Sequence, residues 1–260
     1  MLRYVNINGH MLSMQNVMVN IGSFLGIIVV ALLLYKQYGK TENTEKTGRK
    51  IGRYIVIPML TEVVIAKTIG PFLGRWIRGM SYAFSEITTN KAEYIWENAG
   101  THFIGTVLAS AVLLPVVFRI VYEKKERRNI LNALAFFFPI QHIFNRLGCL
   151  MEGCCYGVPM HGAGSIKFPD EILTYRVFPS QILEIVCMVL LLCGLLFCLK
   201  KKGPVFALSM GGFGMSIFLS EFFMDKTGVM QYFGLTVIQF FALLLCGIAL
   251  VLWVSSKTEK

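Results

Sequence analysis

Long apolar runs, each sufficient to cross a lipid bilayer, constrain the fold of this chain more than any other feature of its sequence. A transmembrane helix needs about 20 predominantly apolar residues, and such runs recur along the 260 residues. Only 15% of the residues are charged, whereas an ordinary soluble domain has about 25%. The mean hydropathy is +0.61. No long soluble segment is left between the runs, so the sequence predicts one all-α, polytopic membrane domain over residues 1–260.

About seven transmembrane helices are expected. The first apolar run is counted among them because no small-residue cleavage site follows it. The second run carries Glu62 and Lys67. Ionisable residues at such depth normally face the bundle interior and are functional candidates, although a structural pair is the alternative. Residues 75–97 are rich in aromatic side chains and are expected to lie in the membrane interface. The expected spans are 17–34, 54–73, 99–118, 130–144, 180–199, 205–223 and 232–254.

The distribution of lysine and arginine predicts the orientation. With seven spans, the loops 36–53, 123–128 and 200–202 and the C-terminal tail share one side and hold most of the basic residues, in the shorter loops. Cytoplasmic loops carry this excess, so the C-terminus is predicted to be cytoplasmic and the N-terminus outside. The net charge of +10 is thereby explained by topology, and no nucleic-acid partner is expected.

Polar side chains gather at the predicted outer face. The stretch from His142 to Gly157 combines an arginine, a glutamate, a histidine, three cysteines and several glycines, and a loop is expected from Asn145 to Pro179. Four further polar residues are expected near the outer end of their spans. A helix end tolerates any one such residue, but their convergence at one depth with a glycine-rich loop predicts a functional site. These four residues are Glu97, His102, Glu184 and Glu221.

Four segments of the chain carry recognisable motifs. Residues 145–157 begin Asn-Arg-Leu-Gly, residues 178–184 read Phe-Pro-Ser-Gln-Ile-Leu-Glu, residues 96–105 include Trp-Glu and Gly-Thr-His, and residues 214–222 end in Glu-Phe. In order, spacing and predicted membrane side they resemble the prolipoprotein diacylglyceryl transferase family. The resemblance covers roughly residues 90–245. It implies a multi-pass enzyme of the bacterial plasma membrane, with its active face outside the cytoplasm, that functions in lipoprotein biosynthesis.

The resemblance also implies a reaction. The diacylglyceryl group of phosphatidylglycerol moves to the thiol of a lipobox cysteine in an exported precursor, and glycerol phosphate leaves. The partners implied are therefore membrane phospholipid and that precursor, and no cofactor or metal is implied. Arg146 suits a phosphate clamp because a guanidinium binds phosphate oxygens bidentately.

The remaining roles are assigned to residues that match the motifs. His102 is the expected base, since its unperturbed pKa is about 6.5, with a structural histidine at a helix end as the alternative. The second cation is expected from Lys67, Arg75 or Arg78, or is missing. Glu97, Glu184 and Glu221 would orient His or Arg, Gln181 would contact substrate, and the glycines would let backbone N–H groups approach the anion. These glycines are Gly148, Gly153 and Gly157.

The chain departs from the family pattern at several positions. Cys149, Glu152 and Cys154 stand where the signature has Asn, Asn and Glu, and the arginines of a later span are replaced by Ile217 and Met224. One alternative function is therefore a non-catalytic or re-purposed phospholipid-binding membrane protein. A lesser alternative is a thiol or metal-binding protein, although the spacing of the cysteines matches no standard zinc motif and a disulfide is favoured over a metal. The cysteines concerned are Cys149, Cys154 and Cys155.

Overall fold

The structure is a computed structural model. It describes residues 4–7, 10–39, 44–80, 103–169, 172–226, 229 and 231–258. Most of these residues are helical, and the strands form only two-stranded hairpins. The expectation of an all-α membrane protein is confirmed. Within the described part of the chain, six helical segments are long and apolar enough to span a membrane: Met14–Tyr38, Lys46–Ile77, Phe103–Val121, Ser180–Lys200, Val205–Phe223 and Val237–Ser256.

The N-terminal part forms a hairpin and a first long helix. Strands β1 (Tyr4–Ile7) and β2 (His10–Ser13) pair antiparallel, and α1 (Met14–Leu34) follows directly. The helix starts three residues earlier than expected because the Ser13 side chain caps it, accepting a hydrogen bond from Asn16 N–H. Its end continues into a π-turn, η1 (Tyr35–Gly39).

The second span is a succession of short helices. It comprises α2 (Thr44–Ile51), the π-turn η2 (Gly52–Val56), α3 (Ile57–Lys67) and α4 (Ile69–Met80). The break at Thr68 follows from Pro71, which has no N–H to donate to the carbonyl of Lys67. Residues 75–80, expected in an interfacial connection, instead complete α4. The rest of that connection, from residue 81, lies outside the described residues.

The structure differs most from the sequence-based expectation at the fourth predicted span. After α7 (Phe103–Val121), the charged residues from Lys124 begin α8 (Lys124–Leu134) rather than a loop. Pro139 cannot donate to Ala135, so the helix breaks there and resumes as α9 (Phe137–Glu152). The expected loop from Asn145 is wrong over its first turns, because α9 continues until Gly153 ends it in a left-handed conformation with φ of 74°.

The C-terminal half matches the expected spans closely. It contains α10 (Ser180–Lys200), α11 (Val205–Ser220) with the short helix η3 (Glu221–Phe223), and α12 (Val237–Thr258). The last span begins later than expected because residues 231–236 form a hairpin of β5 (Gln231–Tyr232) and β6 (Leu235–Thr236). A further hairpin, β3 (Ile166–Lys167) and β4 (Arg176–Val177), lies between α9 and α10.

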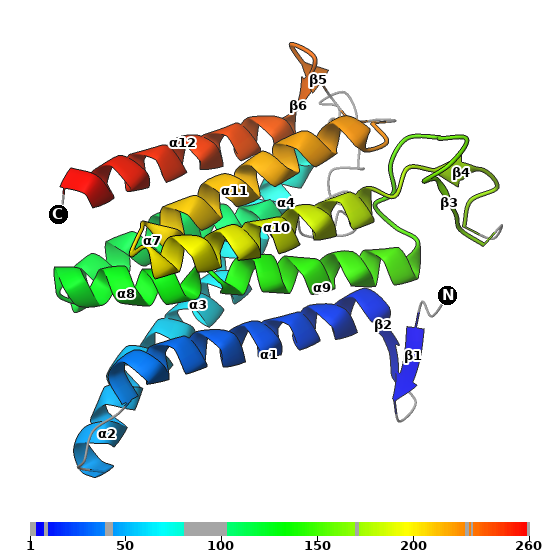
Figure 1. The fold of residues 1–260 in the computed structure, drawn as a ribbon. Helices are drawn as coiled ribbons and strands as arrows, with labels where there is room; N and C mark the ends of the chain where they lie inside the picture. The colour runs from blue at the N-terminus through cyan, green and yellow to red at the C-terminus, as the bar shows by residue number, and fades with distance from the viewer. Residues whose placement is uncertain are drawn as a thin grey trace.

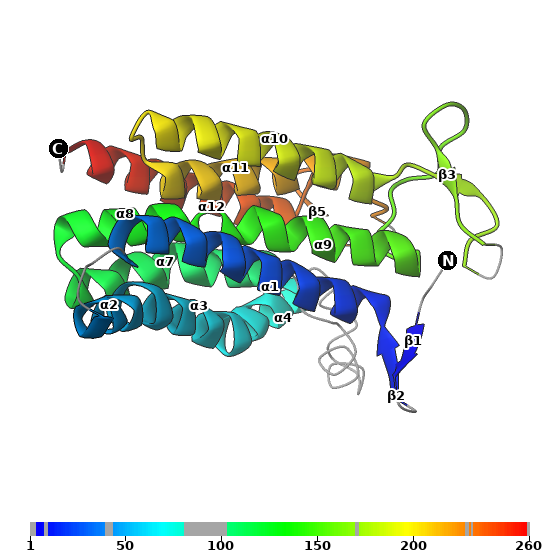
Figure 2. The ribbon, with the colours of Figure 1, turned by 60° about the horizontal axis from the view of Figure 1, so that its bottom comes forward.

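The helices form an elongated bundle with two distinct ends. Helix α9 packs between α1 and α10, α11 packs on α12, and α4 packs on α7. Helices α8 and α9 run in succession along the bundle (Figures 1 and 2). The hairpin β3–β4 and the N-terminus lie at one end, and the C-terminus, α2 and the start of α8 lie at the other (Figure 1). Which end faces the cytoplasm stays a prediction.

Candidate functional site

A buried cluster of a histidine, an arginine and a glutamate joins α9 to α10. His142 and Arg146 are four residues apart on α9 and therefore share one face of that helix. His142 Nε2 lies 2.7 Å from Glu184 Oε2, and Arg146 Nε donates to the same oxygen at 2.8 Å. The three side chains are almost fully buried, with exposed fractions of 1% for His142 and Glu184 and 7% for Arg146. One oxygen of the Glu184 carboxylate thus contacts both His142 and Arg146.

The surroundings of His142 combine an ion pair with aromatic side chains. A buried ion needs a partner of opposite charge, and Arg146 and Glu184 satisfy that need for each other. Glu184 contacts the Nε2 side of the His142 ring, and Nδ1 is the other ring nitrogen. That Nδ1 atom has no hydrogen-bond partner among the described residues, and Phe103 and Phe213 pack against the ring with centroid distances of 5.4 and 4.9 Å. The cluster therefore contains a buried ring nitrogen that has no partner among the described residues and lies in an apolar environment.

The Arg146 guanidinium is only partly engaged. Among the described residues its hydrogen bond to Glu184 is made through Nε, and no hydrogen bond of its two terminal nitrogens is found. A guanidinium held by one edge presents its other N–H groups in a fixed fork, the geometry that suits phosphate oxygens. The arrangement can bind an anion while Glu184 keeps the side chain in place.

The start of α10 also anchors the segment that follows α9. Ser180 Oγ donates to the Cys155 carbonyl at 2.7 Å, and Gln181 Nε2 donates to the Cys154 carbonyl at 2.6 Å. Gln181 is fully buried, and its Oε1 has no partner among the described residues. The amide group of Gln181 thus fixes the loop and leaves one acceptor unused beside the cluster.

Glu221 lies at the end of α11, near the same cluster. It is 7% exposed, and its Oε1 accepts a hydrogen bond from Thr236 Oγ1 at 3.0 Å. The charges of Glu184 and Arg146 both act on it. Residues distant in sequence therefore meet at one end of the bundle, as the polar pattern predicted for Arg146, Glu184 and Glu221.

The three candidate glycines make close backbone contacts. A Cβ on Gly148 would lie 2.6 Å from Gln15 Cα of α1, and one on Gly157 would lie 2.3 Å from the Phe223 carbonyl oxygen. The Gly153 N–H donates to the Cys149 carbonyl as the cap of α9, and the Gly157 N–H donates to the Phe178 carbonyl. These bonds satisfy the N–H groups that were expected to face an anion. Helix packing and loop closure account for the glycines, and a substrate contact stays a prediction.

The clustered cysteines come together in space. The sulfur atoms of Cys149, Cys154 and Cys155 all lie within 4.8 Å of one another, and no disulfide joins them. Cys155 adopts a positive φ of 55°, a conformation uncommon for a residue with a side chain. A hydrogen bond with Cys149 lowers the pKa of Cys154, but a hydrogen bond with Cys155 and burial outweigh it and raise that pKa to about 12. The Cys154 thiol is therefore protonated near neutral pH.

The other predicted site residues divide into two groups. Lys67 ends α3 and is exposed, and no described contact joins it to the cluster. His102 and Glu97 lie outside the described residues. His142 belongs to the polar stretch identified in the sequence, but no role in the transfer reaction was predicted for it; its four-residue spacing from Arg146 was the available signal.

Comparison with known proteins completes the assignment. No curated protein matches the chain. Residues 10–255, nearly the whole chain, match the family model described as prolipoprotein diacylglyceryl transferase. The match extends beyond the 90–245 region that carries the motifs and includes α1 and the second span. With the helical membrane fold and the polar cluster on α9 and α10, this shows that the chain belongs to the prolipoprotein diacylglyceryl transferase family.

Proposed function

We propose that this protein transfers the diacylglyceryl group of phosphatidylglycerol to a lipobox cysteine of an exported precursor, at the outer face of the bacterial plasma membrane. In this reaction the cysteine sulfur forms a bond to the terminal glyceryl carbon. The bond from that carbon to the phosphate oxygen breaks, and glycerol phosphate leaves with the electron pair. The thiol proton passes to a base. Family membership supports transferase activity, and the donor, acceptor and membrane side are the parts proposed here.

The observation that carries the proposal is the half-engaged guanidinium of Arg146. Glu184 holds its Nε at 2.8 Å and leaves the terminal nitrogens for a phosphate. The phosphate gains charge as it leaves, so a preorganised cation beside it lowers the barrier. The position in a buried, largely apolar bundle strengthens this effect because the local dielectric is low.

Two histidines are candidates for the base. His102 matches the family motif and stays the predicted base. His142 has the orphan Nδ1 and the carboxylate partner Glu184, which together resemble a base and its orienting group. In the proposal, His142 helps to hold Glu184 and Arg146 in position, and His102 removes the proton from the thiol.

The decisive experiment is an in vitro transfer assay with purified full-length protein, phosphatidylglycerol and a lipobox peptide. Transfer to the peptide, measured by mass spectrometry, is expected for the natural sequence and is expected to be lost in Arg146→Ala. In His102→Ala the transfer should fall strongly, and in His142→Gln it should fall less. A larger loss in His142→Gln, with the fold intact, would reassign the base to His142.

A phospholipid-binding protein without transfer activity is the second candidate function. It is favoured by the absence of the family's later-span arginines: Ile217 stands at one such position, is 2% exposed and lies in the hydrophobic core. Removing a stabilising group of this kind typically costs about 10²–10³ in rate. Specific binding of phosphatidylglycerol without any transfer to peptide would establish this candidate instead.

A further inference from the structure

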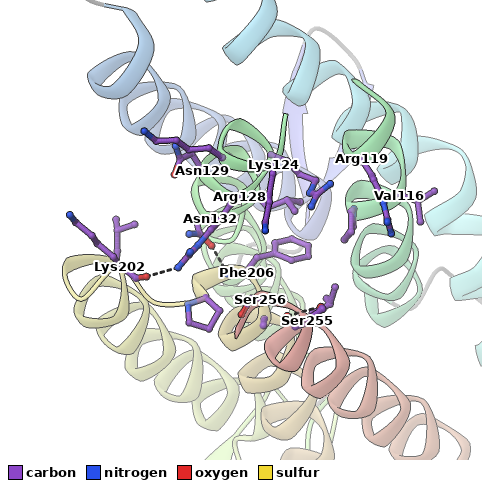
Figure 3. A pocket seen from close by; sticks show the side chains of 18 of the residues that line it. Val116, Arg119, Lys124, Arg128, Asn129, Asn132, Lys202, Phe206, Ser255 and Ser256 are labelled. Atoms are coloured by element: carbon purple, nitrogen blue, oxygen red, sulfur yellow. Dashed lines mark hydrogen bonds between the residues drawn. The ribbon is translucent and has the colours of Figure 1, made fainter. Parts of the chain in front are cut away.

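A cavity lies at the end of the bundle opposite the Arg146 cluster. It has a volume of about 1100 Å³ and opens among α7, α8, α10, α11 and α12. Figure 3 shows it with Lys124, Arg128 and Arg119 along one side and Ser255 and Ser256 opposite them. The proposed transfer reaction uses none of these residues.

The polar lining of this cavity is strongly basic. Six cationic side chains line it and no aspartate or glutamate does. Glu126, the acidic residue of the same helix turn, instead accepts a hydrogen bond from Tyr54 and pairs with Arg53 at 3.5 Å. The lining of the cavity thus gathers cationic side chains without including an acidic one. The six residues are Arg119, Lys124, Lys125, Arg127, Arg128 and Lys202.

Helix dipoles increase this positive potential. Lys124 and Lys125 occupy the first turn of α8, where the helix N-terminus is itself positive and basic side chains are unfavourable. Helix α11 also begins here, since Pro204 and Phe206 line the cavity. Arg119 lies in the last turn of α7, where a cation is favourable without any ligand. Glu123 at the N-cap and Glu126 in the first turn offset part of this repulsion, and a bound anion would relieve it further.

The other part of the lining is apolar. Val116 and Pro115 of α7 extend the cavity toward the membrane-spanning part of the bundle, and Leu199 and Leu252 belong to α10 and α12. A soluble phosphate would use only the basic part of this surface. A molecule that is anionic at one end and apolar along its length would use both parts.

The walls of the cavity are fixed by hydrogen bonds between helices. Arg128 donates to the Lys202 carbonyl at 2.6 Å, and Asn132 Oδ1 accepts from Phe206 N–H at 3.2 Å. Both bonds appear in Figure 3. The site is therefore preformed, which lowers the ordering cost of binding.

We propose that this cavity binds an anionic phospholipid, with the phosphate among the basic side chains and an acyl chain along Val116 and Leu252. Basic pockets between transmembrane helices are suited to anionic headgroups. The proposal does not rest on transfer activity, because the site is at the opposite end of the bundle and contains none of the residues assigned to the reaction.

The test measures binding of phosphatidic acid to the purified full-length chain by native mass spectrometry. The chain carries Arg146→Met with Glu184→Leu, which weakens binding at the reaction site without leaving one buried charge unpaired. Phosphatidylcholine and inorganic phosphate serve as the zwitterionic and the lipid-free probes. The matched variants each remove two positive charges from the same end of the bundle: Arg119→Gln with Lys124→Gln inside the cavity, and Lys36→Gln with Lys200→Gln outside it.

Phosphatidic acid is expected to bind better than phosphatidylcholine, and the cavity variant is expected to weaken it about 20-fold. The control variant should retain the affinity. Equal weakening in both variants overturns the proposal, since the effect is then one of general charge. Equal binding of phosphatidylcholine also overturns it, as does saturation of the cavity by inorganic phosphate with no lipid retained.

Discussion

Glu184 and Arg146 form a buried ion pair that joins α10 to α9, with Glu184 Oε2 2.8 Å from Arg146 Nε. The two residues are 38 positions apart, and the segment between them includes the clustered cysteines and the β3–β4 hairpin. The ion pair therefore holds Arg146, the candidate phosphate-binding residue, in place. It also holds together the two ends of the segment between α9 and α10.

Breaking this pair from one side should destabilise the protein. Glu184→Ala leaves Arg146 buried without a counter-charge, which typically costs about 3–5 kcal/mol. We expect a clearly lower thermal unfolding midpoint in detergent. The double variant Arg146→Met with Glu184→Leu should recover most of the stability, because it removes both buried charges, while transfer activity stays absent. A double variant no more stable than Glu184→Ala would contradict this account.

The geometry of the guanidinium should matter beyond its charge. Arg146→Lys keeps a positive charge near Glu184 but loses the fork that binds two groups at once. Transfer activity is expected to fall about 10²–10³-fold, with a small change in thermal stability. Steady-state kinetics with phosphatidylglycerol and a lipobox peptide provide the measurement. Near-normal activity of Arg146→Lys would show that Arg146 acts as a simple point charge.

The clustered thiols should respond to oxidation. Since the sulfur atoms of Cys149, Cys154 and Cys155 lie within 4.8 Å of one another, mild oxidation is expected to form one disulfide from Cys149. Intact-mass and peptide analysis should find it linked to Cys154 or Cys155. Cys149→Ala should abolish the link, whereas Cys187→Ala, on α10, should leave it. Stoichiometric metal in the purified protein, with all three thiols protected, would instead favour the thiol and metal-binding alternative.

Sequence reasoning predicted the helical membrane fold and the shared level of Arg146, Glu184 and Glu221. Composition and the spacing of the apolar runs are sufficient for these two predictions. Each apolar run has to cross the bilayer, so the end of one span and the start of the next lie on the same side of the membrane. The extent of α9 was missed because a polar, glycine-rich stretch is normally a loop. Here Gly148 is a helix-packing residue against α1 and only Gly153 ends the helix.

The role of His142 depends on rotation of one helix against another, which periodicity alone does not give. The sequence places His142 and Arg146 on one face of a helix, but it does not say that Glu184 faces them. That contact arises because α9 packs against α10 along their length. The basic cavity was missed for a related reason: residues 123–128 were expected to be a loop, and their charges converge only because α8 is a helix.

Gly148 provides a test of the packing that positions the site. A Cβ at this position would lie 2.6 Å from Gln15 Cα, so Gly148→Ala should separate α1 from α9 and cost about 1–3 kcal/mol. Gly194, in α10, is the matched control because nothing lies within 4 Å of its added Cβ. Gly194→Ala should be neutral or stabilise the helix by up to about 1 kcal/mol. Thermal unfolding of both variants in detergent decides the matter. If the two substitutions have equal effects, the contact between α1 and α9 does not position Arg146, and the site depends on the α9–α10 contact alone.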